Sequence, residues 1–234
     1  MAMSEFLPNT EHTESRASLR KSLRKSLRKV RNSISAEQRA HSALQISKQL
    51  NSLPCVATAT SIAGYLVNDG EIDLSAFMQG AFMHDAFMDE AVIENPVAKN
   101  TSDISSTTTF SLPVLHPVCK GHLLFLEYGP HTQLIKNKYN IDEPKLACTN
   151  VVPVSTIDII LMPLVGFDNR GNRLGMGGGY YDRTLAFTRF AQQKPILIGI
   201  AHDEQEVDTL PCESWDIPLD TIVTPKRILT FSNK

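Results

Sequence analysis

The chain has 234 residues, of which 42% are hydrophobic and 21% charged, a balance typical of a globular protein with one large domain or two small ones. The formal net charge is -2, and no apolar run approaches the ~20 residues that cross a bilayer, which excludes an integral membrane protein. The four cysteines contain no C-x-x-C pair and no secretory signal is readable, so we expect reduced thiols, no zinc cluster and a cytoplasmic location.

The first predicted element is a basic helix, preceded by residues 1–15, which are polar and expected to be flexible. From Arg16 to Arg31 the chain carries eight basic residues and no acidic one. Apolar residues at helical spacing predict one buried face, made of Leu19, Leu23, Leu27 and Val30. A neighbouring row has the same four-residue spacing and consists of Arg20, Arg24 and Arg28. These guanidinium groups can converge on one anion, so leucines would dock the helix and arginines would be presented.

Three interpretations of the basic helix remain open from charge alone. It can be a solvated basic face, an arm that binds nucleic acid or a membrane surface, or a phosphate-binding helix of an enzyme. The segment contains no aromatic residue that would stack on bases, and the rest of the chain is acidic. Both observations weigh against nucleic acid as the partner.

The segments after the basic helix predict a second helix and a buried strand. Ser33 or Ser35 fits the start of a helix that runs to about Leu50. Residues 60–66 form a short apolar run that ends in a polar turn, which is typical of a buried strand. Glu71 follows at the carboxyl end of this strand.

The middle of the chain predicts a helix, a loop and a hairpin. Residues 76–88 repeat Ala-Phe-Met three times, which favours a helix that packs in the core over a cofactor site. Residues 99–109 are rich in Ser and Thr and predict a loop. Residues 113–118 and 123–128 are apolar and separated by a short polar segment, which indicates a hairpin.

Two continuous apolar runs indicate the centre of a parallel sheet. Residues 157–163 and 196–201 are too short for typical helices, and strands buried on both faces have this pattern. Residues 181–192 between them predict a helix. The order of strand, glycine loop, helix and strand predicts an α/β fold with helices on both sides of a mostly parallel sheet. We expect a single domain over residues 16–234.

A glycine-rich loop stands immediately before this last helix. Four of the five positions from Gly175 to Gly179 are glycine, so backbone N–H groups can approach a ligand closely. A helix N-terminus adds unsatisfied donors and partial positive charge, a combination that favours a phosphate. No Gly-Lys-Ser/Thr follows, which excludes a Walker A loop. Tyr180 and Asp182 stand where G-x-G-x-x-G needs another glycine, which excludes the dinucleotide fingerprint.

The residues beside the loop favour a nucleotide site over a tight structural turn. Arg173 can neutralise phosphate oxygens, and Asp182 can hold a divalent cation that bridges them. Tyr180 and Tyr181 can stack on a flat heterocycle or fill core space.

The segment from Arg173 to Arg183, Arg-Leu-Gly-Met-Gly-Gly-Gly-Tyr-Tyr-Asp-Arg, closely resembles the signature of the 5-formyltetrahydrofolate cyclo-ligase family. Other pieces of the family pattern follow in the same order, and they are the basic helix, residues 70–72, 139–144, 215–220 and 224–225. The resemblance spans residues 19–225. It implies a compact α/β/α fold that binds Mg-ATP and 5-formyltetrahydrofolate in one cleft.

The resemblance also implies roles for individual residues. The implied ATP-binding residues are Arg20, Lys21, Arg24, Arg173, Leu174, Gly175, Met176, Gly177, Gly178, Gly179, Tyr180 and Tyr181. The implied folate-binding residues are Leu66, Glu71, Tyr139, Met176, Gly177, Gly178, Gly179 and Tyr180. Asp182 and Asp216 are the implied magnesium ligands, and Arg173 and Tyr180 the implied catalytic residues. The tandem repeat leaves the register of the arginines open by four residues; counting back from residues 35–37 favours Arg20 and Arg24, and Arg28 stays an alternative.

The chain departs from the family pattern at two places. Tyr139 stands where some relatives have tryptophan, and either ring can stack on a pterin. Met176 and Gly178 stand where some relatives carry Arg and Lys, so neutralisation of phosphate would depend more on Arg173 and the basic helix. Each implied role also has a structural alternative, since Asp216 can satisfy turn backbone and Glu71 can be an exposed carboxylate.

The implied reaction is the ATP- and magnesium-dependent conversion of 5-formyltetrahydrofolate to 5,10-methenyltetrahydrofolate. The formyl oxygen would be phosphorylated and N10 would attack the activated carbon, with release of ADP and phosphate. We expect no nucleic-acid or membrane partner and a monomer, with a dimer left open. Two alternatives are another ATP-dependent or sugar-phosphate enzyme on a similar scaffold, and a nucleic-acid-binding protein that uses the basic helix.

Overall fold

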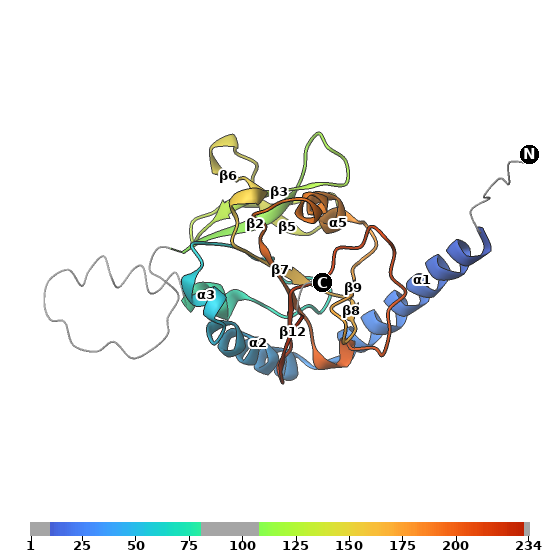
Figure 1. Cartoon of the computed structure of the whole chain (residues 1–234). Helices are drawn as coiled ribbons and strands as arrows, with labels where there is room; N and C mark the ends of the chain where they lie inside the picture. Colours follow the sequence, from blue (N-terminus) through green and yellow to red (C-terminus); the bar gives the residue numbers. More distant parts are fainter. Residues whose placement is uncertain (1–9, 81–107, 232–234) are drawn as a thin grey trace, which may run out of the picture.

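The computed structural model describes residues 10–80 and 108–231, with side chains from Arg16 onward (Figure 1). The helices are α1 (Thr10–Ser33), α2 (Ala36–Asn51), α3 (Pro54–Thr58) and α5 (Tyr180–Thr184), with the 3-10 helices η1 (Cys148–Asn150), η2 (Val154–Thr156), η3 (Ala186–Arg189) and η4 (Asp203–Gln205). Residues 75–80 are also helical. The strands are β1 (Ser61–Ala63), β2 (Thr109–Leu115), β3 (Leu123–Tyr128), β4 (Leu134–Lys136), β5 (Asp142–Pro144), β6 (Val151–Val152), β7 (Ile159–Pro163), β8 (Gly166–Phe167), β9 (Arg173–Leu174), β10 (Ile196–Ile200), β11 (Thr221–Val223) and β12 (Ile228–Thr230).

One eight-stranded sheet organises the chain, in the order β12-β11-β10-β7-β1-β2-β3-β6. The strands from β11 to β2 run parallel, whereas β12, β3 and β6 are antiparallel to their neighbours. Parallel neighbours need crossover connections, and the one from β7 to β10 contains α5 and η3. Two small hairpins, β4–β5 and β8–β9, stand outside the large sheet.

Strand β7 divides the core into two layers because successive side chains of a strand point to opposite faces. Ile159 and Leu161 pack with residues of α2 and α3 on one face. Ile160 and Met162 pack with Leu185, which follows α5, on the other face. Figure 1 shows α2 and α3 together on one side of the sheet and α5 on the other. The predicted α/β fold with helices on both faces of a mostly parallel sheet is confirmed.

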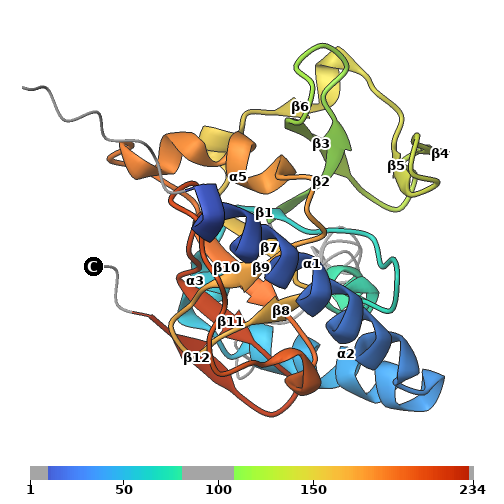
Figure 2. The ribbon, with the colours of Figure 1, turned by 90° about the vertical axis from the view of Figure 1, so that its right-hand side faces the viewer.

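Helix α1 crosses the edge of the sheet where the parallel strands end. Figure 2 shows it running diagonally in front of β8, β9 and β10. Near its C-terminus the buried Arg31 donates to the carbonyl oxygen of Leu164, just after β7, at 2.9 Å. Arg31 also binds Asp69, in the loop that follows β1, at 2.6 Å. Leu27 packs in a small apolar cluster with Leu174 of β9. The carboxyl edge of a parallel sheet is where open α/β folds bind ligands.

Several predicted elements are confirmed at their predicted places. Helix α2 begins after Ser35, whose hydroxyl accepts a hydrogen bond from the backbone N–H of Gln38 in a capping box. Strands β2 and β3 form the predicted antiparallel hairpin, although β2 spans Thr109–Leu115 and not residues 113–118, and β7 and β10 are parallel neighbours. The apolar face of the basic helix is buried in part, because Leu27 is buried and Leu23 packs beside it, whereas Leu19 and Val30 are exposed.

Other boundaries differ from the prediction. Helix α1 begins at Thr10, so part of the segment expected to be flexible is helical. Strand β1 spans only Ser61–Ala63 of the predicted residues 60–66. Beyond its end, the Tyr65 hydroxyl donates a hydrogen bond to the carbonyl oxygen of Ile72. The helix predicted over residues 181–192 ends at Thr184 and is followed by the 3-10 helix η3, where the backbone N–H of Thr188 donates to the carbonyl oxygen of Leu185, three residues back instead of four. Residues 81–107, which hold most of the Ala-Phe-Met repeat and of the predicted Ser/Thr-rich loop, lie outside the described residues.

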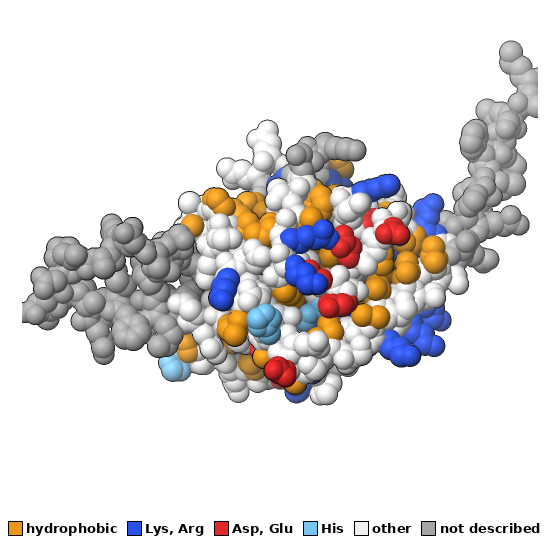
Figure 3. Space-filling model, turned by 90° about the horizontal axis from the view of Figure 1, so that it is seen from below, with side chains coloured by type: hydrophobic (Ala, Val, Ile, Leu, Met, Phe, Trp, Pro, Cys, Tyr) orange, Lys and Arg blue, Asp and Glu red, His pale blue; other side chains and the backbone are white. Residues whose placement is uncertain are grey.

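The described part of the chain contains no helix that is long and apolar enough to span a membrane. Figure 3 shows one face of the molecule on which basic side chains lie beside acidic ones, with apolar side chains between them. On this face the charges of opposite sign are interspersed instead of forming one broad basic patch.

The β8–β9 hairpin delivers Arg173 and the glycine loop to the sheet edge, and a buried carboxylate fixes its turn. Asp168 is fully buried and accepts hydrogen bonds from the backbone N–H groups of Arg170, Asn172 and Leu210. Within this turn Gly171 has φ +82°, a left-handed conformation that L side chains rarely adopt. A Cβ there would lie 3.1 Å from the carbonyl oxygen of Leu219.

We predict that Gly171→Ala destabilises the fold, because left-handed backbone costs a residue with a Cβ about 1–2 kcal/mol and the new methyl group meets backbone. The expected decrease in Tm is roughly 2–8 °C for a chain of this size, measured by differential scanning calorimetry. Gly129→Ala is the control, since a Cβ at Gly129 would meet nothing within 4 Å. Equal melting temperatures for Gly171→Ala and the wild type would contradict this account of the turn.

Candidate active site

A cavity of about 910 Å³ opens at the carboxyl edge of the sheet. Its walls come from α1, the loop after β1, the β4–β5 hairpin, the glycine loop and the segment around Asp216. It brings together residues that are far apart in the sequence, including Arg24, Glu71, Tyr139 and Gly177. A second hollow of about 560 Å³ beside Leu126 contains none of the predicted site residues.

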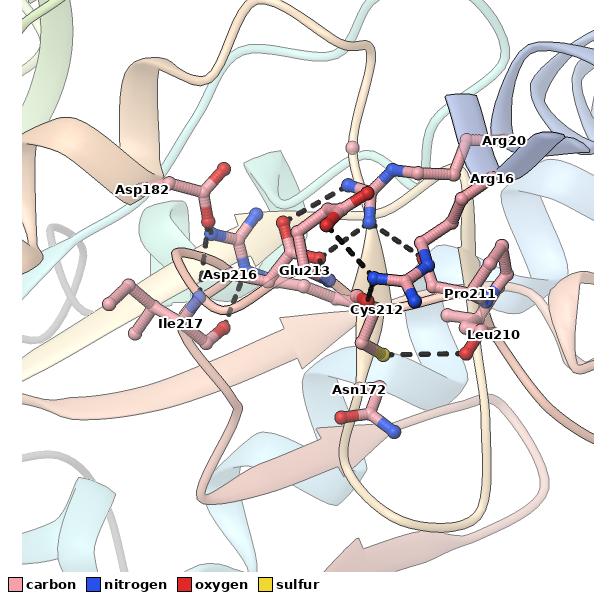
Figure 4. Close-up of polar contacts among 12 residues, drawn as sticks. Arg16, Arg20, Asn172, Asp182, Leu210, Pro211, Cys212, Glu213, Asp216 and Ile217 are labelled. Carbon is pink, nitrogen blue, oxygen red and sulfur yellow. Dashed lines mark hydrogen bonds and ion pairs between the residues drawn. The ribbon is translucent and has the colours of Figure 1, made fainter. Parts of the chain in front are cut away.

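The arginine row of α1 faces the cavity, as its four-residue spacing predicts. Arg20 forms a two-pronged ion pair with Asp216, at 2.5 Å to Oδ2 and 3.0 Å to Oδ1. It also donates to the carbonyl oxygen of Pro211 at 2.8 Å. One turn earlier, Arg16 pairs with Glu213 at 3.1 Å. Figure 4 shows both side chains reaching from α1 to this segment, which is therefore tied to the start of the helix.

Arg24 lies over the glycine loop. Its Nε donates to the carbonyl oxygen of Gly175 at 2.8 Å, and its guanidinium carbon would be 3.3 Å from a Cβ at Gly177. Burial and the charge of the neighbouring Arg20 lower the pKa of Arg24. Among the described residues, no carboxylate lies within 4.0 Å of its guanidinium group. A half-buried cation without an acidic partner beside free backbone amides is suited to an anion.

The backbone of the glycine loop needs glycine where it bends most. Gly177 has φ +96° and Gly179 has φ +65°, both in the left-handed region. Arg183 links the glycine loop to the β2–β3 turn, because it donates to the carbonyl oxygens of both Gly178 and Gly121. Helix α5, which follows, has only five residues, so its dipole is smaller than the predicted helix would supply. Charge for a phosphate must therefore come mainly from arginines.

Arg173 is buried at the base of the loop and joins it to the C-terminal part of the chain. Its Nη2 pairs with Asp182 Oδ1 at 2.5 Å, and its Nε donates to the carbonyl oxygen of Ile217 at 3.2 Å. Asp182 Oδ1 also accepts from the backbone N–H of Ile217 at 3.2 Å. One carboxylate oxygen of Asp182 is thus used for structure, while Oδ2 makes no hydrogen bond or ion pair with the described residues.

The two predicted magnesium ligands differ in how available they are. Asp182 lines the cavity, and its Oδ2 makes no hydrogen bond with the described residues, which fits a cation that is held by one or two carboxylates and by substrate phosphates. Asp216 uses both oxygens on Arg20 and also accepts from the backbone N–H of Glu213. No group of three or more acidic, His or Cys side chains that could hold a metal occurs among the described residues. A site made by protein alone is therefore absent from this part of the chain.

At the other end of the cavity a buried carboxylate faces the predicted folate position. Burial raises the pKa of Glu71 to about 7, although Arg31, 3.8 Å away, acts in the opposite direction. The neighbouring Asp69 is different, because hydrogen bonds from Arg28 hold its pKa at about 2. Arg31 binds Asp69 more closely than Glu71, and Glu71 also accepts a hydrogen bond from the backbone N–H of Asn68 at 3.1 Å. It can accept hydrogen bonds from a ligand.

Two tyrosines close one wall of the cavity. Their hydroxyl groups, of Tyr139 and Tyr180, lie 2.7 Å apart, and the rings meet edge to face with centroids 6.2 Å apart. Lys138 stacks over the Tyr139 ring, with its ammonium 5.0 Å from the centroid. The contact connects the β4–β5 hairpin to the glycine loop across the cavity.

The cavity contains all the predicted site residues except two. Lys21 points to solvent from α1, because residues 20 and 21 cannot share a helix face, and Leu174 is buried against Leu27. Sequence reasoning gave no role to Trp215, which lines the cavity, or to Asp168, which fixes the preceding hairpin. The position of Trp215, the single tryptophan, directly before the predicted ligand Asp216 could have indicated its place in the site. The contacts of Asp168 are not visible in any local pattern.

Known proteins with similar sequences share one activity in their names. The family model for the 5-formyltetrahydrofolate cyclo-ligase family matches residues 14–225. The 5-formyltetrahydrofolate cyclo-ligase of Escherichia coli strain K12 is 37% identical over 198 residues, which cover 85% of this chain and 96% of that protein. The enzyme of the same name from Haemophilus influenzae is 38% identical over 194 residues, covering 83% and 91% respectively.

A solved structure agrees with this assignment. The NMR structure of Aquifex aeolicus 5,10-methenyltetrahydrofolate synthetase superposes with a TM-score of 0.70 at 27% identity, covering 92% of this chain and 94% of that one. A synthetase from Mycoplasma pneumoniae has the same fold, with a TM-score of 0.61 at 24% identity. The family match over residues 14–225 extends from α1 to β11 and includes every element that lines the cavity. This chain is a member of the 5-formyltetrahydrofolate cyclo-ligase family.

Proposed function

We propose that this enzyme uses ATP to convert 5-formyltetrahydrofolate to 5,10-methenyltetrahydrofolate. The observation that carries the proposal is the position of Arg24, a half-buried cation without a carboxylate partner among the described residues, directly over the glycine loop. Arg20 lies one turn away on the same face. Together with the loop amides, these side chains can hold a triphosphate.

The cavity is lined by two kinds of residues, which suit two different ligands. Cations and glycine amides form one part, near Arg20 and Arg24, which suits the phosphates of ATP. Glu71 and Tyr139 line another part, which suits the polar N–H groups and flat ring of a reduced folate. Gly177 and its neighbours lie between them, where the γ-phosphate and the formyl group would meet.

The chemistry requires activation of a poor electrophile. The formyl carbon on N5 is deactivated by the nitrogen lone pair, and its oxygen is a poor leaving group. We propose that the γ-phosphoryl group moves to the formyl oxygen with departure of ADP, that N10 then attacks the carbon, and that phosphate leaves with this oxygen as N10 loses its proton. Phosphoryl transfer of this kind depends on positioning of the two reactants and on neutralisation of the phosphate charge more than on a nucleophile from the protein.

Magnesium would be held by Asp182 through its free Oδ2 together with the phosphates, and its bound charge would neutralise phosphate oxygens. Asp216 would join only if Arg20 moved from it to the phosphates, since both its oxygens are engaged. Arg173 keeps the Asp182 carboxylate in place. Tyr180 would contact the ligands from the wall that it forms with Tyr139.

The direct test of this function is product formation. We expect the near-ultraviolet band of the methenyl product to appear when the protein is mixed with 5-formyltetrahydrofolate, ATP and Mg²⁺, and to be lost without ATP or with EDTA. Hydrolysis of ATP without the methenyl band would indicate a different ATP-dependent enzyme. Product formation that persists in EDTA would contradict the role of magnesium.

Arg24→Ala should weaken ATP binding selectively, because it removes a charge-assisted hydrogen bond to phosphate. We expect kcat/KM for ATP to fall about 10–100-fold while KM for the folate changes little. Lys25→Ala is the matched control, since Lys25 is exposed on the same helix and lies outside the cavity. If kcat/KM for ATP fell equally in the two variants, the effect would come from the overall charge of the helix and not from a contact of Arg24 with ATP.

Activity should also depend on the protonation of Glu71. With a pKa of about 7, its carboxylate is lost as the pH falls below neutrality, and with it an acceptor for the folate. We expect kcat/KM for the folate to approach a decrease of about tenfold per pH unit below pH 7. Glu71→Gln should be low and flat over this range, and the exposed Glu127→Gln should retain the wild-type profile. A wild-type profile that is flat from pH 8 to pH 5.5 would exclude this role.

A further inference from the structure

Trp215 stands at the rim of the cavity on a turn that is fixed from both sides. Within the turn, the N–H of Glu213 donates to Asp216 Oδ2 at 2.9 Å and the N–H of Asp216 donates to the carbonyl oxygen of Glu213 at 3.1 Å. From α1, Arg16 and Arg20 bind the carboxylates of the same two residues, as Figure 4 shows. The backbone that carries the indole is therefore held in place relative to the arginine row.

The indole itself is left largely uncovered. Trp215 lines the cavity and is 59% exposed, so an indole face is available to a ligand, and covering a large aromatic side chain is favourable. On α1, the cavity residue nearest in sequence to Arg20 on the N-terminal side is Ala17, whose small side chain leaves space at this end. A fixed, exposed aromatic face beside open space is suited to a flat heterocycle.

The position of Trp215 along the cavity selects which heterocycle this is. The arginine row runs from Arg20, whose partner Asp216 adjoins Trp215, to Arg28, which binds Asp69 close to Glu71. At 1.5 Å per residue, these two arginines are about 12 Å apart along the helix. Trp215 is thus at the opposite end of the row from Glu71, with the phosphate-binding residues between them.

We propose that Trp215 stacks on the adenine ring of ATP, with the triphosphate running from Arg20 toward Arg24 and the glycine loop. This inference rests on the proposed function, since it assigns the base of the nucleotide whose phosphates the arginines hold. Stacking on an aromatic face is typically worth enough to change affinity about tenfold, which is ~1.4 kcal/mol. Trp215 is the only tryptophan in the chain, so its emission reports directly on this contact.

The experiment compares two ligands and three variants of the full-length protein. ADP with Mg²⁺ should change the tryptophan emission of the wild type in a saturable manner, whereas tripolyphosphate, which has no base, should compete with ADP and reverse the change. Trp215→Ala should raise KM for ATP about tenfold with KM for the folate within twofold of wild type. Trp215→Phe should recover most of this loss, because it keeps an aromatic face.

Phe190→Ala is the matched control, since Phe190 is 90% exposed and does not line the cavity. Its KM for ATP should equal that of the wild type. The proposal is overturned if ADP saturates the enzyme without any change in tryptophan emission, or if Trp215→Ala keeps the wild-type KM for ATP. Failure of the proposed function would be distinct, because methenyl product would then be absent while ADP still changed the emission.

Discussion

The site depends on one packing arrangement, in which α1 lies across the carboxyl edge of the sheet. Leu27 anchors the helix on the β8–β9 hairpin, and the buried Arg31 ties its end to the backbone after β7 and to Asp69 after β1. Because the helix is straight and regular, docking this one end determines where Arg20 and Arg24 point. Elements from both ends of the chain thereby form one cavity.

All but one of the arginines that line the cavity in the described part of the chain have a carboxylate partner, and the exception lies where we propose that phosphate binds. Arg20, Arg28 and Arg173 each have a carboxylate partner, which fixes their side chains before any ligand arrives. Arg24 is the exception among the arginines that line the cavity in the described part of the chain. Its charge is opposed by burial and by Arg20, so an incoming anion relieves an unfavourable arrangement. This arrangement, with three paired arginines and one unpaired one, favours an anion-binding role of the basic helix over the alternative of a solvated basic face.

Much of this arrangement could be predicted from local patterns, and the remainder could not for physical reasons. Local patterns alone predicted the parallel strands, the arginine face and the glycine loop, since each depends on periodicity or on backbone freedom. They could not exclude Lys21 or Arg28, and they favoured Arg20 and Arg24 only by their distance from the next helix, because a four-residue repeat is the same in every register until Asp69 and Asp216 supply partners. The length of α5 and the role of Asp168 depend on contacts between distant segments, which no local pattern contains.

The joint action of α1 and the glycine loop can be measured without turnover. In ¹⁵N-labelled protein, addition of tripolyphosphate should shift the Nε–H resonance of Arg24 and the backbone amide resonance of Gly177 along a single shared saturation curve. Both groups would then be seen to respond to one bound anion. A shift in one resonance with the other unmoved, or two curves with different midpoints, would mean that the helix and the loop do not bind the same phosphate chain.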